Sequence, residues 1–470
     1  MEMPACPGNR IGVDLSGDAL DLCDPIHGAA RPANEAGAIS GWIGDHLSGW
    51  RPPRLRSELP GPAQVADPLQ QEIEVGAGMI ALPFSRDEYE RRLRAIRAEM
   101  ERRGLDLLIL NDIANQHYVT GYDGWSFYTP QAVLVPLTEE EPVWIGRAMD
   151  AAGGRLTAWM QPDNIVGFPE SYVQRADRHP MDWVAEWICA RGWGRGAIGV
   201  ELEAYYYSPK AHARLVAGLP EATIHDADLL VSWIRSVKSE PEIAYLRKAA
   251  RLAEAAVTAA HAAIAPGVRE CDAVAAIQAA QIAGSPDFAG DVTALPPTIL
   301  AGENASAPHI LWSDRRFTPG ETIALELAGA VRHYTAGLAR TMQLGPVPPK
   351  VAAVEMAVLE GMEAVLATMR PGIAAEEVEA SWRRVIERHG LKKESRIGYS
   401  IGVAYPPDWG EHTISLRPGD RTELRPGNVF HCILGMWMDG WGLEVSETIL
   451  VTDTGNETLT RFPRGIHVRD

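Results

Sequence analysis

Basic side chains are in short supply in this 470-residue chain, which has 44 Lys and Arg against 62 Asp and Glu and a formal net charge of −18. The phosphate backbone of nucleic acids and anionic membrane surfaces would both repel so acidic a chain. No apolar run approaches the roughly 20 residues of a membrane-spanning helix, and no apolar signal segment opens the sequence. We therefore expect neither nucleic acid nor membrane as a partner.

Cysteine is also scarce. The five cysteines are scattered, and no two of them form a CxxC pair. This pattern argues against a disulfide framework and against a structural zinc cluster. Together with the missing signal segment, it predicts a cytoplasmic protein. The rest of the composition, 46% hydrophobic and 23% charged, is that of an ordinary globular protein, and the length suits two domains.

The chain divides into three stretches of different character. Residues 1–78 are rich in Pro, Gly and Ala and show no sustained period, so we expect a disordered extension with at most a short helix near 39–47. Residues 79–234 alternate short apolar strands with helical segments, which predicts a small α/β domain. Residues 235–470 combine helices with long β-rich stretches and predict an α+β domain.

Local signals set several element boundaries. Ser85 and Glu88 form a capping-box pattern ahead of an apolar stripe that stops at Gly104, which predicts a helix between them. The same pattern at Ser239 and Glu242 predicts a second, longer helix. In the last third of the chain we expect strands at 322–327, 333–344, 429–438 and 443–451.

Two segments resemble those of the creatinase/prolidase family. NQHYVTGYDG (115–124) is similar to part of its N-terminal domain, and RSVKSEPEIAYLRKAA (235–250) is similar to its interdomain linker. The second half resembles the pita-bread domain of methionine aminopeptidase, prolidase and creatinase. The resemblance covers about 80–465 and implies an α/β creatinase-like N-terminal domain, an α+β pita-bread catalytic domain and a homodimer.

The metallopeptidases of this family bind two metal ions through two Asp, one His and two Glu. Matched motif to motif, the same positions here carry Glu326, Gly337, Tyr399, Ile433 and Ser446. One carboxylate, a phenol and a hydroxyl cannot hold a divalent ion against water. The resemblance therefore predicts a metal-independent enzyme without a cofactor, for which creatinase is the precedent in the family.

Within the family, several segments resemble the ectoine hydrolases. These segments are TGYDGWSFY (120–128), DNIVGFPESYVQ (163–174), SAPHILW (306–312), GYSIGVAYPPDWGE (398–411) and WGLEVSETILVTDTG (441–455). The resemblance implies that the substrate is ectoine, whose cyclic amidine ring is opened to N-acetyl-L-2,4-diaminobutyrate, and that a deacetylase is functionally coupled to the enzyme. Two alternatives stay open: a creatinase-like amidinohydrolase acting on another small cationic substrate, and a non-catalytic pita-bread binding protein.

Opening an amidine ring without a metal requires a base or nucleophile and a proton donor for the leaving nitrogen. Glu326 lies in an otherwise apolar strand at a position that matches a metal ligand of the family, so we expect it to be the base or nucleophile. The alternative is a structural Glu paired with Arg340. His309 matches an active-site histidine of the family and would carry the proton, unless it is an ordinary loop histidine.

Glu444 and Glu447 lie in one expected strand. Alternation puts Glu444 on the same face as Ser446 and Glu447 on the other face, unless a bulge exchanges them. We expect one of the two to pair with the amidinium, whereas a solvated strand face is the alternative for Glu447. Tyr399 stands where the family has histidine, and would either donate a hydrogen bond or fill the space of the metals.

Aromatic rings and an arginine are candidate substrate contacts, because rings bind cations and an arginine binds a carboxylate. The candidates are Tyr122, Trp125, Phe127, Tyr128, Trp437 and Arg147. In creatinase-like dimers the N-terminal domain of one subunit reaches the active site of the other, so the loop at 122–128 would cap the partner's pocket. Core packing or a dimer interface is the alternative. His431 and His412 are weaker candidates for the site.

Overall fold

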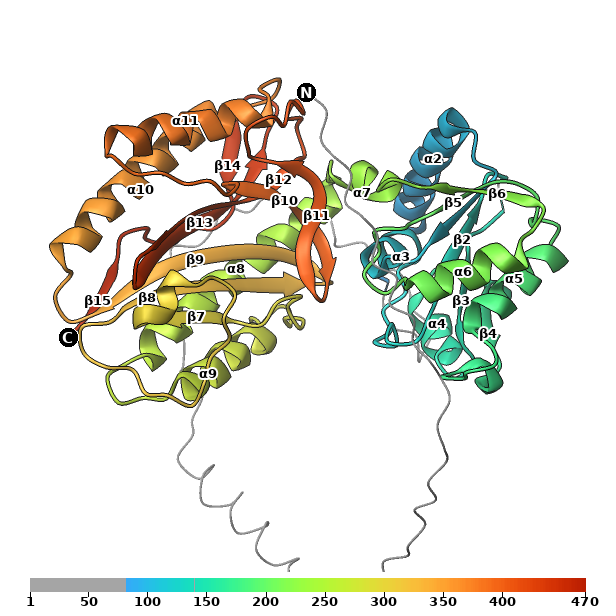
Figure 1. Ribbon diagram of the computed structural model, residues 1–470, viewed down its shortest axis with the longest axis horizontal. Helices are drawn as coiled ribbons and strands as arrows, with labels where there is room; N and C mark the ends of the chain where they lie inside the picture. Colours follow the sequence, from blue (N-terminus) through green and yellow to red (C-terminus); the bar gives the residue numbers. More distant parts are fainter. Residues whose placement is uncertain (1–81, 139) are drawn as a thin grey trace, which may run out of the picture. The chain divides into compact units, whose positions relative to one another are not determined.

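The computed structural model describes residues 82–138 and 140–470 (Figure 1). The extension expected at 1–78, with its short helix near 39–47, lies outside the described residues. Two sheets organise the described part, one of six strands and one of nine. Within the described ranges, no helix has both the length and the apolarity to cross a membrane.

The six-stranded sheet has the order β4-β3-β2-β1-β5-β6. Its strands are β1 (Leu107–Leu110), β2 (Ala132–Pro136), β3 (Val143–Arg147), β4 (Ile165–Phe168), β5 (Gly196–Val200) and β6 (Ala222–Asp226). The helices of this region are α2 (Arg86–Arg103), α3 (Ile113–Thr120), α4 (Ala151–Thr157), α5 (Pro180–Ala190), α6 (Pro209–Gly218) and α7 (Leu230–Arg235), with short 3-10 turns η1 (Pro162–Asn164) and η2 (Glu170–Tyr172). Strand β1 is apolar throughout because Leu108 and Leu110 pack in one core and Leu107 and Ile109 in another, one on each face of the sheet.

Helix α2 shows where local sequence signals succeed and fail. It begins after Ser85 and ends at Gly104, whose φ of 67° is the left-handed conformation that glycine adopts readily. The expected capping box is wrong, because the Ser85 side chain makes no cap hydrogen bond. Glu88 instead accepts hydrogen bonds from the buried Arg92 and from the hydroxyl of Ser239, at 3.0 and 2.9 Å. A charged neighbour on the same helix and a hydroxyl distant in sequence therefore outcompete the helix's own N-terminus for Glu88.

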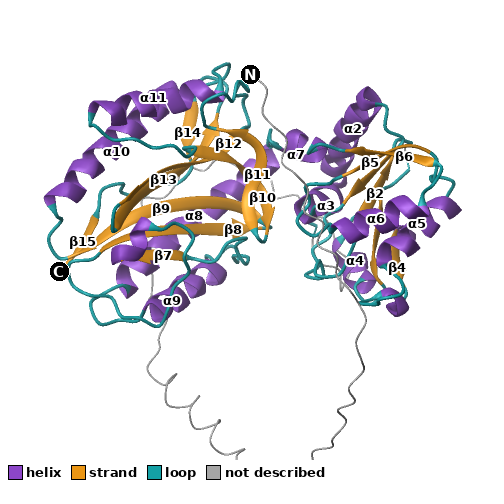
Figure 2. Ribbon diagram, viewed as in Figure 1, coloured by secondary structure: helices purple, strands orange, loops and turns teal. Residues whose placement is uncertain are grey.

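The nine-stranded sheet has the path β14-β13-β12-β10-β9-β8-β7, with β11 paired to β10 and β15 to β9 (Figure 2). Its strands are β7 (Thr298–Ala301), β8 (Thr322–Val331), β9 (Tyr334–Leu344), β10 (Gly398–Tyr405), β11 (Asp408–Ser415), β12 (Val429–Met438), β13 (Trp441–Val451), β14 (Asn456–Thr458) and β15 (His467–Arg469). The accompanying helices are α8 (Glu240–Ala263), α9 (Glu270–Ala283), α10 (Pro349–Thr368) and α11 (Ala375–Arg388), with the 3-10 turn η3 (Gly302–Ser306). Helices α8 and α9 pack against β8, and α10 packs against β12 and β13.

Alternating side chains give this sheet two different faces. Leu325 and Leu327 of β8 lie in the core formed with α8 and α9, and Val445 of β13 lies in the core formed with α10 and α11. Glu326 lies between Leu325 and Leu327, and Glu444 directly precedes Val445. Because side chains alternate along a strand, both carboxyl groups point to the opposite face. We call this face, opposite α8–α11, the inner face.

Candidate active site

Two carboxyl groups meet on the inner face. Glu326 extends from β8 and Glu444 from β13, two strands that contact each other. Burial and the Asp408 carboxylate raise the pKa of Glu326 to about 7, and burial and Glu326 raise the pKa of Glu444 well above its usual range. Neither side-chain oxygen of Glu444 has a hydrogen-bond partner among the described residues. Because burial disfavours the ionised form of both groups, this arrangement can offer one acid and one base near neutral pH.

The positions that the sequence motifs match to metal ligands of the family carry few donor atoms, and several of these residues contact one another. At Gly337 a β-carbon would lie 2.8 Å from Nε2 of His431. That Nε2 lies 2.7 Å from Oγ of Ser446, and Ile433 pairs with Ser446 across the sheet without offering a donor. Glu326 alone keeps a carboxylate. The residues present do not fit a dinuclear metal centre.

A hydrogen-bonded chain of rings lies beside the carboxyl pair. Trp409 Nε1 donates to Tyr399 Oη at 2.6 Å, and this Oη lies 3.2 Å from Nδ1 of His431. Burial and Glu326 raise the pKa of Tyr399, so the phenol stays protonated, and burial lowers the pKa of His431 to about 3, so the imidazole stays neutral. Tyr399 thus both fills space and forms hydrogen bonds on the inner face.

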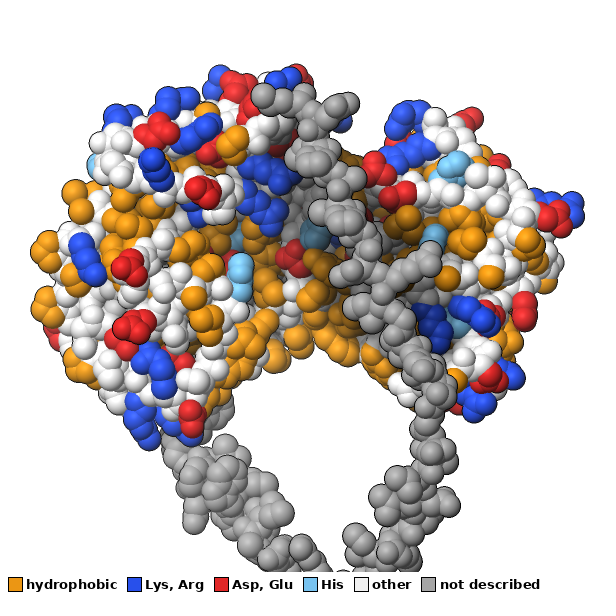
Figure 3. Space-filling model, viewed as in Figure 1, with side chains coloured by type: hydrophobic (Ala, Val, Ile, Leu, Met, Phe, Trp, Pro, Cys, Tyr) orange, Lys and Arg blue, Asp and Glu red, His pale blue; other side chains and the backbone are white. Residues whose placement is uncertain are grey.

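Two basic residues that the sequence analysis missed lie near the same groups. Lys393 Nζ donates to the carbonyl of Gly435 at 2.6 Å and opposes the raised pKa of Glu444. The guanidinium of Arg396 lies 4.2 Å above the ring of Tyr399. In Figure 3, Lys and Arg side chains gather over the region that β10 and β12 occupy in Figure 1. The site therefore combines an acidic pair with nearby positive charge, which suits a small zwitterion.

Glu447 lies on the other side of β13, three residues beyond Glu444. Its Oε1 accepts hydrogen bonds from Arg340 and Arg464, each at 2.8 Å, and its Oε2 accepts one from Thr460. This placement does not fit the catalytic role expected for Glu447, because alternation turns its side chain toward a saturated ion-pair cluster. Arg340 therefore pairs with Glu447. It is not the structural partner of Glu326 that the sequence had left open as an alternative.

His309 lies in the loop that follows η3. Its side chain is exposed and its backbone is left-handed, with φ 71°. The 3-10 turn η3 contacts both β8 and β13, so this loop starts beside the two strands that carry the carboxyl pair. Trp437 packs partly buried against Leu300, Ala305 and Ala324.

The N-terminal aromatic candidates are arranged in two groups. Tyr122 is buried, with its hydroxyl 2.7 Å from Ser126 Oγ. Phe127 packs against other aromatic rings and is also buried. Trp125 and Tyr128, by contrast, are 53% and 67% exposed. These two exposed rings are the members of the 122–128 loop that remain open to a partner.

The arginine candidate of the N-terminal domain is already engaged. Both Nε and Nη2 of Arg147 donate to the carboxylate of Glu170, at 2.7 and 2.6 Å. A substrate carboxylate would have to displace this bidentate pair. Lys393 lowers the raised pKa of Glu444 and Arg396 lies over the ring of Tyr399, which makes these two candidates for the role that the sequence suggested for Arg147.

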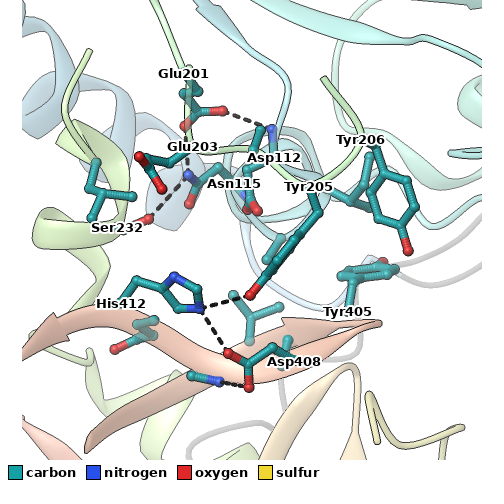
Figure 4. Close-up of a pocket in the computed structure, with 18 of the residues that line it drawn as sticks. Asp112, Asn115, Glu201, Glu203, Tyr205, Tyr206, Ser232, Tyr405, Asp408 and His412 are labelled. Carbon is teal, nitrogen blue, oxygen red and sulfur yellow. Dashed lines mark hydrogen bonds and ion pairs between the residues drawn. The ribbon is translucent and has the colours of Figure 1, made fainter. Parts of the chain in front are cut away.

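A separate polar pocket of about 50 Å³ is lined by residues of α3, of the segment between β5 and α6, and of β10 and β11 (Figure 4). Inside it, His412 Nε2 lies 2.8 Å from Asp408 Oδ2 and 3.2 Å from Tyr205 Oη. The hydrogen bond with Asp408 raises the pKa of His412. Because Asp408 also raises the pKa of Glu326, it couples this pocket electrostatically to the carboxyl pair.

Comparisons with known proteins agree with this architecture. Residues 92–237 match the model of the creatinase/prolidase N-terminal domain, and residues 244–453 match that of metallopeptidase family M24. The ectoine hydrolase of Halomonas elongata is 44% identical over 397 residues, which cover 83% of this chain and 99% of that protein. An uncharacterized hydrolase/peptidase of Sinorhizobium fredii is 40% identical over 392 residues, covering 83% of this chain and all of that one, 100%.

Solved structures support the fold alone, since their sequences are distant. The prolidase of Thermococcus sibiricus superposes with a TM-score of 0.71 at 19% identity, covering 81% of this chain and 99% of that one. The dipeptidase PepE of Mycobacterium ulcerans gives 0.68 at 23% identity, covering 82% and 99%. The expected fold class, a creatinase-like domain followed by a pita-bread domain, is confirmed.

Proposed function

The chain belongs to metallopeptidase family M24, with a creatinase/prolidase N-terminal domain, and from this premise we propose that it is a hydrolase that opens the cyclic amidine ring of ectoine. The observation that carries the proposal is the carboxyl pair on the inner face, formed by the half-buried Glu326, which matches a metal-ligand position of the family, and the buried Glu444. The extensive identity with the Halomonas elongata ectoine hydrolase supports this choice of substrate.

We propose that the reaction is metal-independent. Of the donor set that the family uses, Gly337 and Ile433 supply none, and His431 and Ser446 fill the space and bond to each other. Water must then be activated, or replaced as nucleophile, by the protein's own groups. No step of the proposed mechanism passes through a metal ion.

Glu326 is the proposed base or nucleophile. Its pKa of about 7 leaves a large ionised fraction at neutral pH, while the proton stays on Glu444. The Glu326 carboxylate either removes a proton from the water that adds to the amidine carbon, or adds to this carbon itself, in which case water later hydrolyses the bond between Glu326 and the substrate. Glu444 protonates the leaving ring nitrogen as the C–N bond breaks. Water supplies the new acetyl oxygen, and the product is N-acetyl-L-2,4-diaminobutyrate.

The charges of the inner face match those of the substrate. The single negative charge of the carboxyl pair complements the amidinium, and Arg396 and Lys393 offer partners for the substrate carboxylate. We propose that the exposed rings of Trp125 and Tyr128 cap the site of a second subunit in a homodimer. His309 would deliver protons from the loop after η3. The N-acetyl product calls for a deacetylase as the next enzyme.

The test is ring opening followed by proton NMR, using protein stripped of metal and kept in chelator. We expect ectoine to be converted to N-acetyl-diaminobutyrate at an undiminished rate. Turnover that appears only after manganese or zinc is added would refute metal independence. No turnover under either condition would refute ectoine as the substrate, and a panel of small amidines and guanidines would then distinguish another amidinohydrolase from a binding protein.

A further inference from the structure

Two histidines and an aspartate meet in a cluster that is separate from the carboxyl pair. His117 lies on α3, Asp123 lies in the loop after α3, and His333 lies in the turn between β8 and β9. One ligand atom from each lies within 4.8 Å of the others. Imidazole nitrogens and a carboxylate oxygen are the donors that zinc and related divalent transition metals prefer.

His117 is oriented as a metal ligand. Its Nδ1 lies 3.0 Å from the carbonyl oxygen of Tyr122, which can only accept, so Nδ1 carries the proton and Nε2 carries the lone pair. That Nε2 is buried and has no hydrogen-bond partner among the described residues, in a side chain only 1% exposed. A backbone carbonyl fixing the other ring nitrogen is the arrangement found around metal-bound histidines.

The other two residues are held in place by their surroundings. His333 Nε2 lies 2.7 Å from Asp123 Oδ1, and the His333 backbone N–H donates to Asp291 Oδ2 at 2.9 Å. The His333 ring also stacks on Tyr405, with centroids 4.2 Å apart.

The turn that presents His333 is itself unusual. Val331 and Tyr334 pair across β8 and β9, which leaves Arg332 and His333 as a two-residue turn. Both have left-handed backbones, with φ 51° and 63°, a conformation for which such turns normally use Asn and Gly. Ordinary residues adopt it here at a cost in free energy, which the contacts of His333 offset.

We propose that His117, Asp123 and His333 bind one divalent transition-metal ion, with zinc as the reference ion, and that this ion ties the N-terminal domain to the β8–β9 turn. Two imidazoles and a carboxylate leave a coordination position for water. The ion would satisfy the unpartnered Nε2 of His117 and would take the place of the proton between His333 and Asp123. Hard cations such as magnesium are disfavoured, because two of the three donors are nitrogen.

This site differs from the metal positions of the family, which lie on the inner face around Glu326. Stoichiometric zinc in the purified protein would therefore not identify a catalytic metal. The inference is independent of the ectoine proposal, since zinc can bind whether or not the protein opens the ring.

The test is a calorimetric titration of the chelator-stripped full chain with zinc chloride, together with thermal unfolding. We expect one zinc per chain and a higher unfolding temperature in its presence. Asp123→Asn keeps a hydrogen-bond acceptor for His333 on a partly exposed side chain but is a poor ligand, so affinity should fall about tenfold or more. The matched control is Asp163→Asn, an exposed aspartate in η1, which should bind zinc as the unaltered chain does.

Three results would overturn the proposal. The first is no binding at micromolar zinc. The second is equal affinity in the Asp123→Asn variant and the unaltered chain. The third is binding that disappears in Glu326→Gln but persists in Asp123→Asn, because the ion would then lie on the inner face.

Discussion

Glu444 and Glu447 are three residues apart on one strand and are equally buried at 1% exposure, but their carboxyl groups differ in hydrogen bonding. Glu447 accepts hydrogen bonds from two arginines and a threonine, whereas neither carboxyl oxygen of Glu444 has a partner among the described residues. A buried polar group without partners costs free energy, so it persists where it serves a purpose other than stability. The comparison teaches that burial alone does not distinguish these two carboxyls, and that the hydrogen bonds made by their oxygens do.

The largest effect is expected on the inner face. Glu326→Gln keeps the size of the side chain and removes its charge, so ring opening should fall by roughly 10³-fold while the fold persists. NMR turnover and thermal unfolding would measure the two properties. Glu186→Gln, an exposed substitution on α5, serves as the control. Retained turnover in Glu326→Gln would show that another group activates the nucleophile.

On the other face of β13, where Glu447 lies, we expect a substitution to lower stability. Glu447→Gln leaves the Arg340 and Arg464 guanidinium groups without their shared carboxylate, and removing one partner of a buried ion pair costs about 3–5 kcal/mol of unfolding free energy. Urea unfolding measures this loss, and turnover per folded molecule should stay unchanged. If turnover fell and stability did not, the division between the two faces of β13 would be wrong.

Glu444→Gln should lower turnover without lowering stability, which is the reverse of the result expected for Glu447→Gln. Turnover should fall by about 100-fold, because the proton donor is lost. The pKa of Glu444 is raised in the folded state. Between the ordinary carboxyl pKa of the unfolded chain and this raised pKa, the folded state keeps a proton that the unfolded state has released. The free energy of unfolding therefore falls as pH rises through this window. The variant lacks this group, so it should be more stable than the unaltered chain at about pH 8 and similar to it at about pH 4. Urea unfolding at both pH values measures the difference, and a uniform loss of stability at both would contradict the prediction.

The smallest effect is expected at Tyr399. Tyr399→Phe removes the hydroxyl that bonds Trp409 and His431, at a cost of about 1 kcal/mol. Turnover should fall by less than about tenfold, since the hydroxyl positions neighbours and the carboxyl pair remains. Steady-state kinetics and urea unfolding measure both. A loss in kcat of several hundredfold would instead place the phenol in the chemistry.

The sequence allowed much of this site to be predicted, because strand alternation is a local property. The period of two in β13 separates Glu444 from Glu447, and the apolar neighbours of Glu326 mark it as an unusual residue of its strand. What the sequence could not reveal depends on contacts between distant residues. The partner of Arg340 lies 107 positions away, and Lys393 and Asp408 lie outside any periodic signal. The capping box at Ser85 failed for the same reason, since the hydroxyl that bonds Glu88 belongs to Ser239, 151 positions along the chain.

Gly337 has a consequence for how such a site can change over evolutionary time. An aspartate there would place a β-carbon only 2.8 Å from the ring of His431, so this ring would have to shift or be replaced before a metal ligand could fit. Replacing His431 first would break its bonds to Ser446 and Tyr399 without creating a metal site. Neither substitution alone therefore creates a metal site, and both Gly337 and His431 would have to change together for one to form.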